Sequence, residues 1–268
     1  MNDVKPWQIQ LFDKTLKKKQ RFNELKGYLG EVAPATRCLL VTCGDNNGAM
    51  NYKLRELGGK WSFADLEDFC VEEMSQLLGE NVPQVPHDNL PYDDDHFDLI
   101  VTIDVHEHLD DPVPFCREIT RVAKPGAKVI FTVPNGDETK LAVKLKHAVG
   151  MSNADYGHSR VGLTIPELYD MMQSSRITPL RSSTFSKFFT EMLELTINFA
   201  YVKIIAPRST TEIEKGQIAP ATSQQVKSVK KLLMAYSIIY PVYTAISKLD
   251  LLLGRQEGYV VVAEGTKQ

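Results

Sequence analysis

The sequence LPYDDDHFDLIVTIDVHEHLDDPVPFCREITRVAKPGAKVIFTVPN, residues 90–135, decides the fold class. After a turn of three aspartates comes an apolar run, 97–103, with the length and composition of a strand. A polar loop at 104–111, a helical segment, a Lys-Pro-Gly turn and a second β-branched run follow. This order predicts a βαβ unit of a parallel sheet. Because such sheets bind ligands at the carboxyl ends of their strands, we expect the loop 104–111 to face a ligand.

Short motifs in this stretch resemble the small-molecule class I S-adenosylmethionine (SAM) dependent methyltransferases, in particular the methyltransferase type 11 group. That family carries, in order, an LPF turn, an FD strand, an EHL-DP loop, an RE helix, a KPGG turn and a VPN-ending strand. The corresponding residues here are Leu90-Pro91-Tyr92, Phe97-Asp98, Glu107-His108-Leu109, Asp111-Pro112, Arg117-Glu118, Lys124-Pro125-Gly126 and Val133-Pro134-Asn135. The resemblance covers about residues 30–190. It implies an α/β, Rossmann-like, doubly wound fold with a mostly parallel seven-stranded sheet, an antiparallel last strand and SAM as the cofactor.

Composition suits one methyltransferase-like domain over 1–268, with an N-terminal helix within 1–34. The formal charge of -3 provides no basic field for nucleic acid. We interpret the basic cluster at 17–21 as the solvated face of the N-terminal helix. The four cysteines lack metal-type CxxC spacing, and no apolar signal segment follows the first residues. These features predict reduced thiols and a cytoplasmic protein.

A turn rich in glycine and asparagine, CGDNNG at 43–48, follows the first core strand, 38–42. The resemblance implies that this turn cradles the amino-acid end of SAM. The family has an acid in the strand and then GxGxG, whereas this chain has Leu40, Thr42 and Asn46 at three of these positions and retains Gly44. The cofactor-binding residues expected here are Cys43, Gly44, Asp45 and Asn46.

Asp65 ends the second strand, 60–64, and lies 21 residues after Gly44. In dinucleotide folds an acid at about this spacing accepts hydrogen bonds from ribose hydroxyls. The resemblance places the same acid here, with Leu66 beside it. The alternative is that Asp65 caps the next helix.

A third strand is expected near Val82–Val85, before the segment where family members hold the adenine ring. The acid that usually receives the adenine amino group aligns with Pro86. The resemblance therefore leaves adenine to Asp88, Asn89 and Leu90. It also places Asp104 and Val105, after the fourth strand, beside the cofactor.

His108 is the candidate catalytic base, because it lies on the loop after the fourth strand and histidine is the residue type best suited to accept a proton near neutral pH. His106 and Glu107 are weaker candidates, and a structural role for His108 is the alternative. No metal ion is expected. A rival interpretation takes Asp104, Glu107 and His108 as ligands of Mg²⁺ or Zn²⁺, as in the ubiquinone-pathway O-methyltransferases.

A loop near 156–160 resembles the family's GHxR loop, which closes over the acceptor. His158 and Arg160 are therefore candidate substrate-binding residues, or they hold the loop down. Thr164 as N-cap with Pro166 and Glu167 predicts the following helix.

Residues 186–257 look like a helical insertion, with a mobile linker about 207–226, before a final strand at 259–263. The apolar run Leu232–Ile246 is too short to span a bilayer, and Pro241 interrupts it. Three interpretations compete: an internal helix packed on the core, a homodimer or substrate-pocket helix, and an interfacial helix in peripheral contact with a membrane.

The sequence thus predicts transfer of a methyl group from SAM to an oxygen, or else a nitrogen or carbon, of a small-molecule or lipid/glycan-type acceptor. Two rivals remain. One is a non-catalytic binding or scaffold protein with an altered cofactor site. The other, a nicotinamide-dependent oxidoreductase, is weakened because the glycine fingerprint is absent.

Overall fold

A computed structural model describes residues 5–44, 47–208 and 217–268. The strands form one sheet in the order β2-β1-β3-β4-β6-β5. β1 to β4 run parallel, and β6 is antiparallel to both of its neighbours, β4 and β5. The strands are β1 (Val32–Thr42), β2 (Gly58–Asp65), β3 (Phe97–Ile103), β4 (Ala123–Pro134), β5 (Ile177–Phe185) and β6 (Val260–Lys267).

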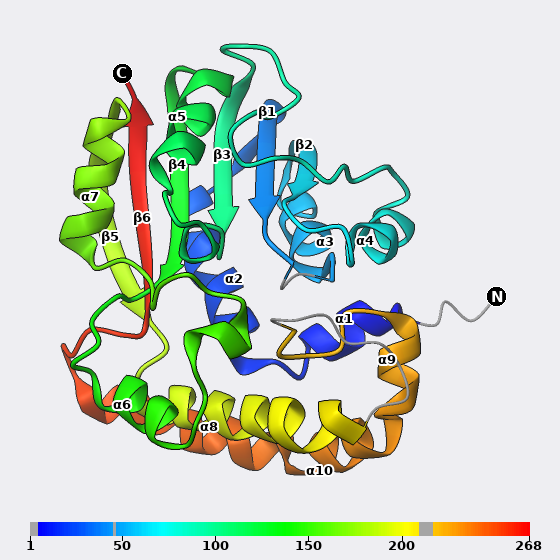
Figure 1. Cartoon of the computed structure of the whole chain (residues 1–268). Helices are drawn as coiled ribbons and strands as arrows, with labels where there is room; N and C mark the ends of the chain where they lie inside the picture. The colour runs from blue at the N-terminus through cyan, green and yellow to red at the C-terminus, as the bar shows by residue number, and fades with distance from the viewer. Residues whose placement is uncertain (1–4, 45–46, 209–216) are drawn as a thin grey trace.

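Helices cover both faces of the sheet and its carboxyl edge (Figure 1). They are α1 (Trp7–Phe12), α2 (Leu16–Leu29), α3 (Ala49–Arg55), α4 (Val71–Leu78), α5 (Val113–Val122), α6 (Leu141–Ala148), α7 (Ile165–Ser174), α8 (Phe188–Phe199), α9 (Ser223–Ser228) and α10 (Lys230–Ser247). Short turns of helix are η1 (His106–His108), η2 (Asn153–Tyr156), η3 (Ala200–Ile205), η4 (Ala206–Arg208) and η5 (Lys248–Leu253).

Alternate residues of β1 face opposite sides of the sheet, as the period of a strand requires. Leu39 and Val41 join the core beneath α5 and α7, while Leu40 joins the core beneath α1 to α4. Both faces are therefore apolar, which explains why the central strands read as continuous hydrophobic runs. The doubly wound fold and the antiparallel last strand are confirmed.

The described residues form six strands, where the sequence predicted seven. The strand predicted near Val82–Val85 is reduced to one parallel bridge, Asp65 with Gln84, beside β2. Pro83 and Pro86 lack the N–H groups that a continued ladder needs, so pairing stops after this bridge.

The family-like motifs of 90–135 are fixed by hydrogen bonds within the fold. Arg121 of α5 donates to the carbonyl oxygens of Leu90 and Tyr92, each at 2.9 Å, and forms an ion pair with Glu118. Glu118 in turn accepts the backbone N–H of Leu90 at 2.9 Å. These bonds clamp the Leu-Pro-Tyr turn to α5. The predicted Lys-Pro-Gly turn is instead the beginning of β4, where the pairing with β3 shifts register.

The C-terminal insertion forms a layer below the carboxyl edge of the sheet, where α8 and α10 lie side by side (Figure 1). Part of the linker predicted at 207–226 lies outside the described residues, at 209–216. α9 begins at Ser223, within the predicted linker, because Thr222 caps it by accepting the N–H of Gln225.

Candidate functional site

A cavity of about 480 Å³ lies between the carboxyl ends of the strands and the layer formed by α8 and α10. Its floor comes from the loops after the parallel strands, where ligands of such sheets bind. Gly44 follows β1, Asp104 and His108 follow β3, and Asn135 follows β4. Of the cofactor-binding residues expected from the sequence, Gly44 and Asp104 line this cavity.

Among the other expected cofactor residues, those that the structure describes do not line it. Cys43 lines a second cavity of about 20 Å³, and burial raises the pKa of its thiol. Asp45 and Asn46 lie outside the described residues. Val105 and Leu90 belong to the buried core, Leu66 packs against it, and Asp88 and Asn89 are exposed. Neither of the two cavities is lined by these five residues or by Asp65.

Asp65 is fully buried, and its carboxylate braces the turn after β1. It accepts the N–H of Gly44 at 2.7 Å, the N–H of Glu67 at 2.9 Å and the hydroxyl of Thr42. Burial raises its pKa to about 6, although these hydrogen bonds favour the charged form. In the observed arrangement, the acid expected to bind ribose therefore holds the glycine turn.

Gly44 has a left-handed backbone, with φ of 65°. A Cβ atom here would lie 2.8 Å from Cζ of Phe69, so the aromatic ring packs directly over the glycine. Thr42, which stands where the family has glycine, supplies the hydroxyl bonded to Asp65. The departure at Thr42 thus occupies one carboxylate oxygen of Asp65, and Phe69 packs against the retained Gly44.

Asp104 lies at the junction of the sheet and the N-terminal helices. Its backbone is left-handed, with φ of 49°, a conformation that costs free energy in a residue other than glycine and often marks a functional position. Its carboxylate forms an ion pair with Arg21 of α2 at 2.6 Å. The pair lines the cavity and joins α2 to the loop after β3.

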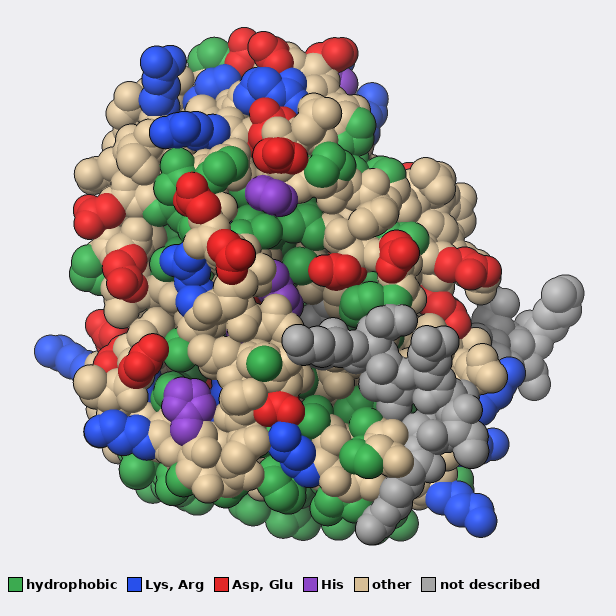
Figure 2. Space-filling model, viewed as in Figure 1, with side chains coloured by type: hydrophobic (Ala, Val, Ile, Leu, Met, Phe, Trp, Pro, Cys, Tyr) green, Lys and Arg blue, Asp and Glu red, His purple; other side chains and the backbone are tan. Residues whose placement is uncertain are grey.

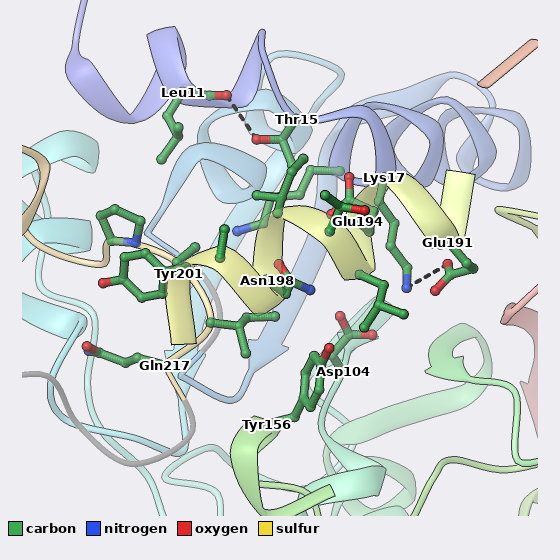
Figure 3. A pocket seen from close by; sticks show the side chains of 18 of the residues that line it. Leu11, Thr15, Lys17, Asp104, Tyr156, Glu191, Glu194, Asn198, Tyr201 and Gln217 are labelled. Atoms are coloured by element: carbon green, nitrogen blue, oxygen red, sulfur yellow. Dashed lines mark hydrogen bonds and ion pairs between the residues drawn. The ribbon is translucent and has the colours of Figure 1, made fainter. Parts of the chain in front are cut away.

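The sequence suggested that the basic cluster at 17–21 is a solvated helix face, but the structure shows that part of the cluster is buried. Arg21 is only 6% exposed, and Lys17 pairs with Glu191 of α8 at 2.9 Å. Burial lowers the pKa of Lys17, but the charge of Glu191, the hydrogen bond to it and the charge of Glu194 together outweigh burial, so the pKa is raised. Figure 3 shows Lys17 and Glu191 facing each other near Glu194. One sequence signal could have indicated that Lys17 and Arg21 act together: they are four residues apart and therefore share one helix face.

One ring nitrogen of His108 bonds to the backbone, and the other is free of protein hydrogen bonds among the described residues. Its Nδ1 lies 3.1 Å from the carbonyl oxygen of Gly157. A carbonyl only accepts, so Nδ1 carries the hydrogen, and Nε2 is the nitrogen that holds the lone pair in the neutral form of the ring. Nε2 is buried and has no hydrogen-bond partner among the described residues. His106, by contrast, is fully buried between Phe115 and Phe131, and burial lowers its pKa to about 3.

The loop at 156–160 is fastened to the loop after β3. Ser159 donates its N–H to the carbonyl of Glu107 at 2.8 Å, and Arg160 donates to the carbonyls of Leu109 and Asp110. Arg160 thus ties the two loops together and does not line the cavity. His158 does line it, and burial lowers its pKa to about 2, which keeps it neutral.

Glu107, His108 and His158 also bring their ligand atoms within 4.8 Å of one another. Such a set could hold a divalent ion. Asp104, part of the ligand set considered from the sequence, is instead paired with Arg21.

Residues without any family motif form most of the remaining wall. A polar zone contains Glu194, Asn198 and Tyr156, and burial raises the pKa of Glu194 (Figure 3). The rest is mainly apolar and comes from α1, α8, η3 and α10. It includes Leu11, Phe12, Leu195, Ile197, Tyr201, Ile205, Leu232, Leu233, Tyr236, Ile239 and Tyr243.

Known proteins match this chain over its central part. The family profile described as "Methyltransferase domain" matches residues 39–131. Norajmaline N-methyltransferase of Rauvolfia serpentina is 52% identical over 43 residues, 16% of this chain and 15% of that enzyme. Ubiquinone biosynthesis O-methyltransferase of Pseudoalteromonas translucida (strain TAC 125) is 29% identical over 101 residues, 35% of this chain and 42% of that enzyme. The chain thus spans less than half the length of these curated relatives.

Solved structures match nearly the whole chain at low identity. Geranyl diphosphate C-methyltransferase from Streptomyces coelicolor A3(2) has a TM-score of 0.56 and 13% identity, covering 94% of this chain and 81% of that one. The [4+2]-cyclase SpnF has a TM-score of 0.57 and 16% identity, with the same two coverages. Residues 39–131 are therefore a methyltransferase domain, carried by a chain with the class I SAM-dependent methyltransferase fold.

Proposed function

We propose that this protein transfers a methyl group from SAM to a hydroxyl oxygen of a largely apolar small-molecule or lipid-type acceptor. The observation that carries the proposal is the single cavity that joins Gly44, Asp104 and His108 to the apolar side chains of α8 and α10. Its size suits a drug-sized ligand, and its few polar groups gather at the sheet end. The S. coelicolor structure holds geranyl diphosphate, Mg²⁺ and S-adenosyl-L-homocysteine, which supports an acceptor with a long apolar part.

The residues present fit SAM at its amino-acid end better than at its ribose end. Gly44 and Asp104 face the cavity, whereas the carboxylate of Asp65 is occupied by Thr42, Gly44 and Glu67. Ribose binding requires Asp65 to exchange the Thr42 hydroxyl and the Glu67 N–H for ribose hydroxyls. A carboxylate can accept several hydrogen bonds, so it can keep the bond to Gly44 while making the exchange.

Bound SAM supplies a methyl group on a sulfonium, with a neutral thioether as the leaving group. The protein then has to place the acceptor oxygen in line with that methyl and remove the hydroxyl proton. Nε2 of His108 is suited to take the proton, because Gly157 fixes the hydrogen on Nδ1. The apolar wall excludes water and holds the rest of the acceptor.

A specific observation favours a second candidate, a binding protein without methyltransferase activity. Phe69 covers Gly44, and the Thr42–Asp65 hydrogen bond closes the ribose side. The same cavity would then bind an apolar ligand without chemistry.

Calorimetric titration with SAM and with S-adenosyl-L-homocysteine separates the two, after any co-purified nucleoside has been removed. Micromolar binding is expected for the methyltransferase, and Asp65→Ala should weaken it about tenfold or more, since a hydrogen bond to a charged group contributes about 1.5–3 kcal/mol. The exposed Asp68 provides the control, Asp68→Ala, with unchanged affinity expected. Absence of binding by either nucleoside would favour the binding protein, and unchanged affinity in Asp65→Ala would remove the ribose assignment.

A further inference from the structure

The outer face of α10 and η5 exposes large apolar side chains to solvent. Ile238, Leu251 and Leu252 are 78%, 81% and 79% exposed. Met234, Val242 and Leu249 extend the same surface, here called the apolar face. Hydrophobic side chains gather along the lower edge of the molecule, where α10 lies (Figure 2). The interpretation of Leu232–Ile246 as an internal core helix is therefore wrong, and an apolar surface of this extent indicates a binding partner.

The charges around the apolar face have one sign. Between residues 227 and 249 the chain has four lysines and no acidic residue. Lys227, Lys230 and Lys231 lie before the apolar face or at its start, Lys248 lies near its other end, and all four are exposed. Asp250, the next acid, turns inward and accepts the backbone N–H groups of Lys187, Phe189 and Thr190. The surface thus presents apolar side chains with lysines at both ends.

We propose that this surface docks on an anionic lipid bilayer, with the helix lying in the plane of the interface. Amphipathic helices with lysine beside a large apolar face bind membranes in this way. A second copy of the chain is a poorer occupant. Antiparallel packing of two such faces would bring Lys230 and Lys231 close to the partner's Lys248, with no acid on either face to neutralise them.

The continuous helical segment Lys230–Leu253 has 24 residues and is long and apolar enough to cross a membrane. Judged from Leu232–Ile246 alone, the sequence made this segment look too short. Its inner side is nevertheless attached to the protein: the hydroxyl of Tyr236 donates to the carbonyl of Lys14 at 2.8 Å, and Lys19 donates to the hydroxyl of Tyr240 at 3.4 Å.

Both ends of the segment are also held by the same body. Before it, Ser223 donates its N–H to Glu73 of α4 at 2.6 Å. At its far end, Asp250 binds the start of α8. A helix that crossed the bilayer would place these two ends on opposite sides and break one set of contacts. The structure therefore favours a helix that lies on the membrane.

Docking would place the cavity next to the bilayer, from which a lipid-type acceptor could enter it. This step rests on the proposed function. Leu232 and Ile239 belong both to the exposed apolar residues of α10 and to the lining of the cavity. The helix that contacts the bilayer thus forms one wall of the acceptor site. A lipid with an apolar chain could pass from the bilayer to His108 without crossing water.

Flotation of the full chain with vesicles tests the docking without SAM or acceptor. We expect the wild type to float with phosphatidylcholine vesicles that contain about one third phosphatidylglycerol, and at least about tenfold less with pure phosphatidylcholine, since each lysine near an anionic surface strengthens binding about fivefold. Binding should weaken with salt. The triple variant Ile238→Ser, Leu251→Ser, Leu252→Ser should lose binding to both kinds of vesicle. A second triple variant, Lys230→Glu, Lys231→Glu, Lys248→Glu, should lose binding to the anionic vesicles.

Two matched controls alter exposed residues elsewhere: Leu180→Ser, on β5, and Lys60→Glu, on β2, should float like the wild type. The proposal is overturned if the wild type stays unbound, or if the triple variants bind as well as the controls. It is also overturned if light scattering shows a dimer that the serine variant dissociates while vesicles bind neither protein, because the occupant is then a second copy. Titration with SAM without vesicles reports separately on the proposed function, and the serine variant should keep the wild-type affinity.

Discussion

The segment 90–135 and the insertion 186–257 meet at one cavity, but they differ in what their side chains do. In 90–135 several motif residues are bonded within the segment: Glu118 and its neighbour Arg121 hold the turn at Leu90, and Asp111 accepts the N–H of Val113 at the start of α5. In 186–257 many apolar side chains remain exposed or line the cavity. The comparison teaches that several motif residues hold the fold together, whereas much of the cavity wall comes from a region with no family motif.

The largest effect is expected at the one position of 90–135 assigned to chemistry. His108→Ala should lower kcat about 100-fold, the usual contribution of a general base, while the dissociation constant of SAM stays unchanged. The assay follows methyl transfer from labelled SAM to an acceptor found by screening lipid extracts. His147→Ala, an exposed histidine of α6, is the control. A kcat within about twofold of wild type would assign His108 a structural role.

The second test breaks the clamp that holds the motif segment. Arg121→Ala removes the bonds to Leu90, Tyr92, Asp94 and Glu118 and should lower the free energy of unfolding by about 2–3 kcal/mol. Urea denaturation measures it. Arg117→Ala alters the arginine of the RE motif, which is exposed, and should change stability by less than about 0.5 kcal/mol. The prediction is that the hydrogen bonds of Arg121 stabilise the turn and that the motif residue Arg117 does not. An equal loss of unfolding free energy in both variants would contradict it.

The smallest effect concerns Asp65 and pH. Its folded-state pKa of about 6 lies above the usual value of 3.8, so the native state binds the proton more readily than the unfolded chain. The stability contributed by this group therefore increases as the pH falls through 6, by about 1 kcal/mol between pH 7 and pH 5. Asp65→Asn cannot titrate and should lack this increment. Urea denaturation at both pH values checks it, and parallel pH profiles for the two proteins would show that Asp65 does not titrate as inferred.

The sequence by itself determined the fold class, and it placed Gly44, Asp104 and His108 at the carboxyl edge of the sheet, where they line the cavity. Motif order and strand periodicity are local properties, so they can be read along the chain. Tertiary structure decided the rest. In the folded protein the carboxylate of Asp65 accepts hydrogen bonds from Thr42 and Gly44. Arg21 pairs with Asp104, 83 positions away in the sequence. The strand predicted at Val82–Val85 is reduced to one bridge.

Tertiary structure also decided which side of α10 faces solvent. Nearly every side of that helix carries apolar residues, so periodicity alone could not separate a core helix from an exposed one. Packing against α8 and the tyrosine contacts to Lys14 and Lys19 fix its inner side. Burial depends on which segments meet, and contacts between residues more than 200 positions apart are not encoded in any local pattern.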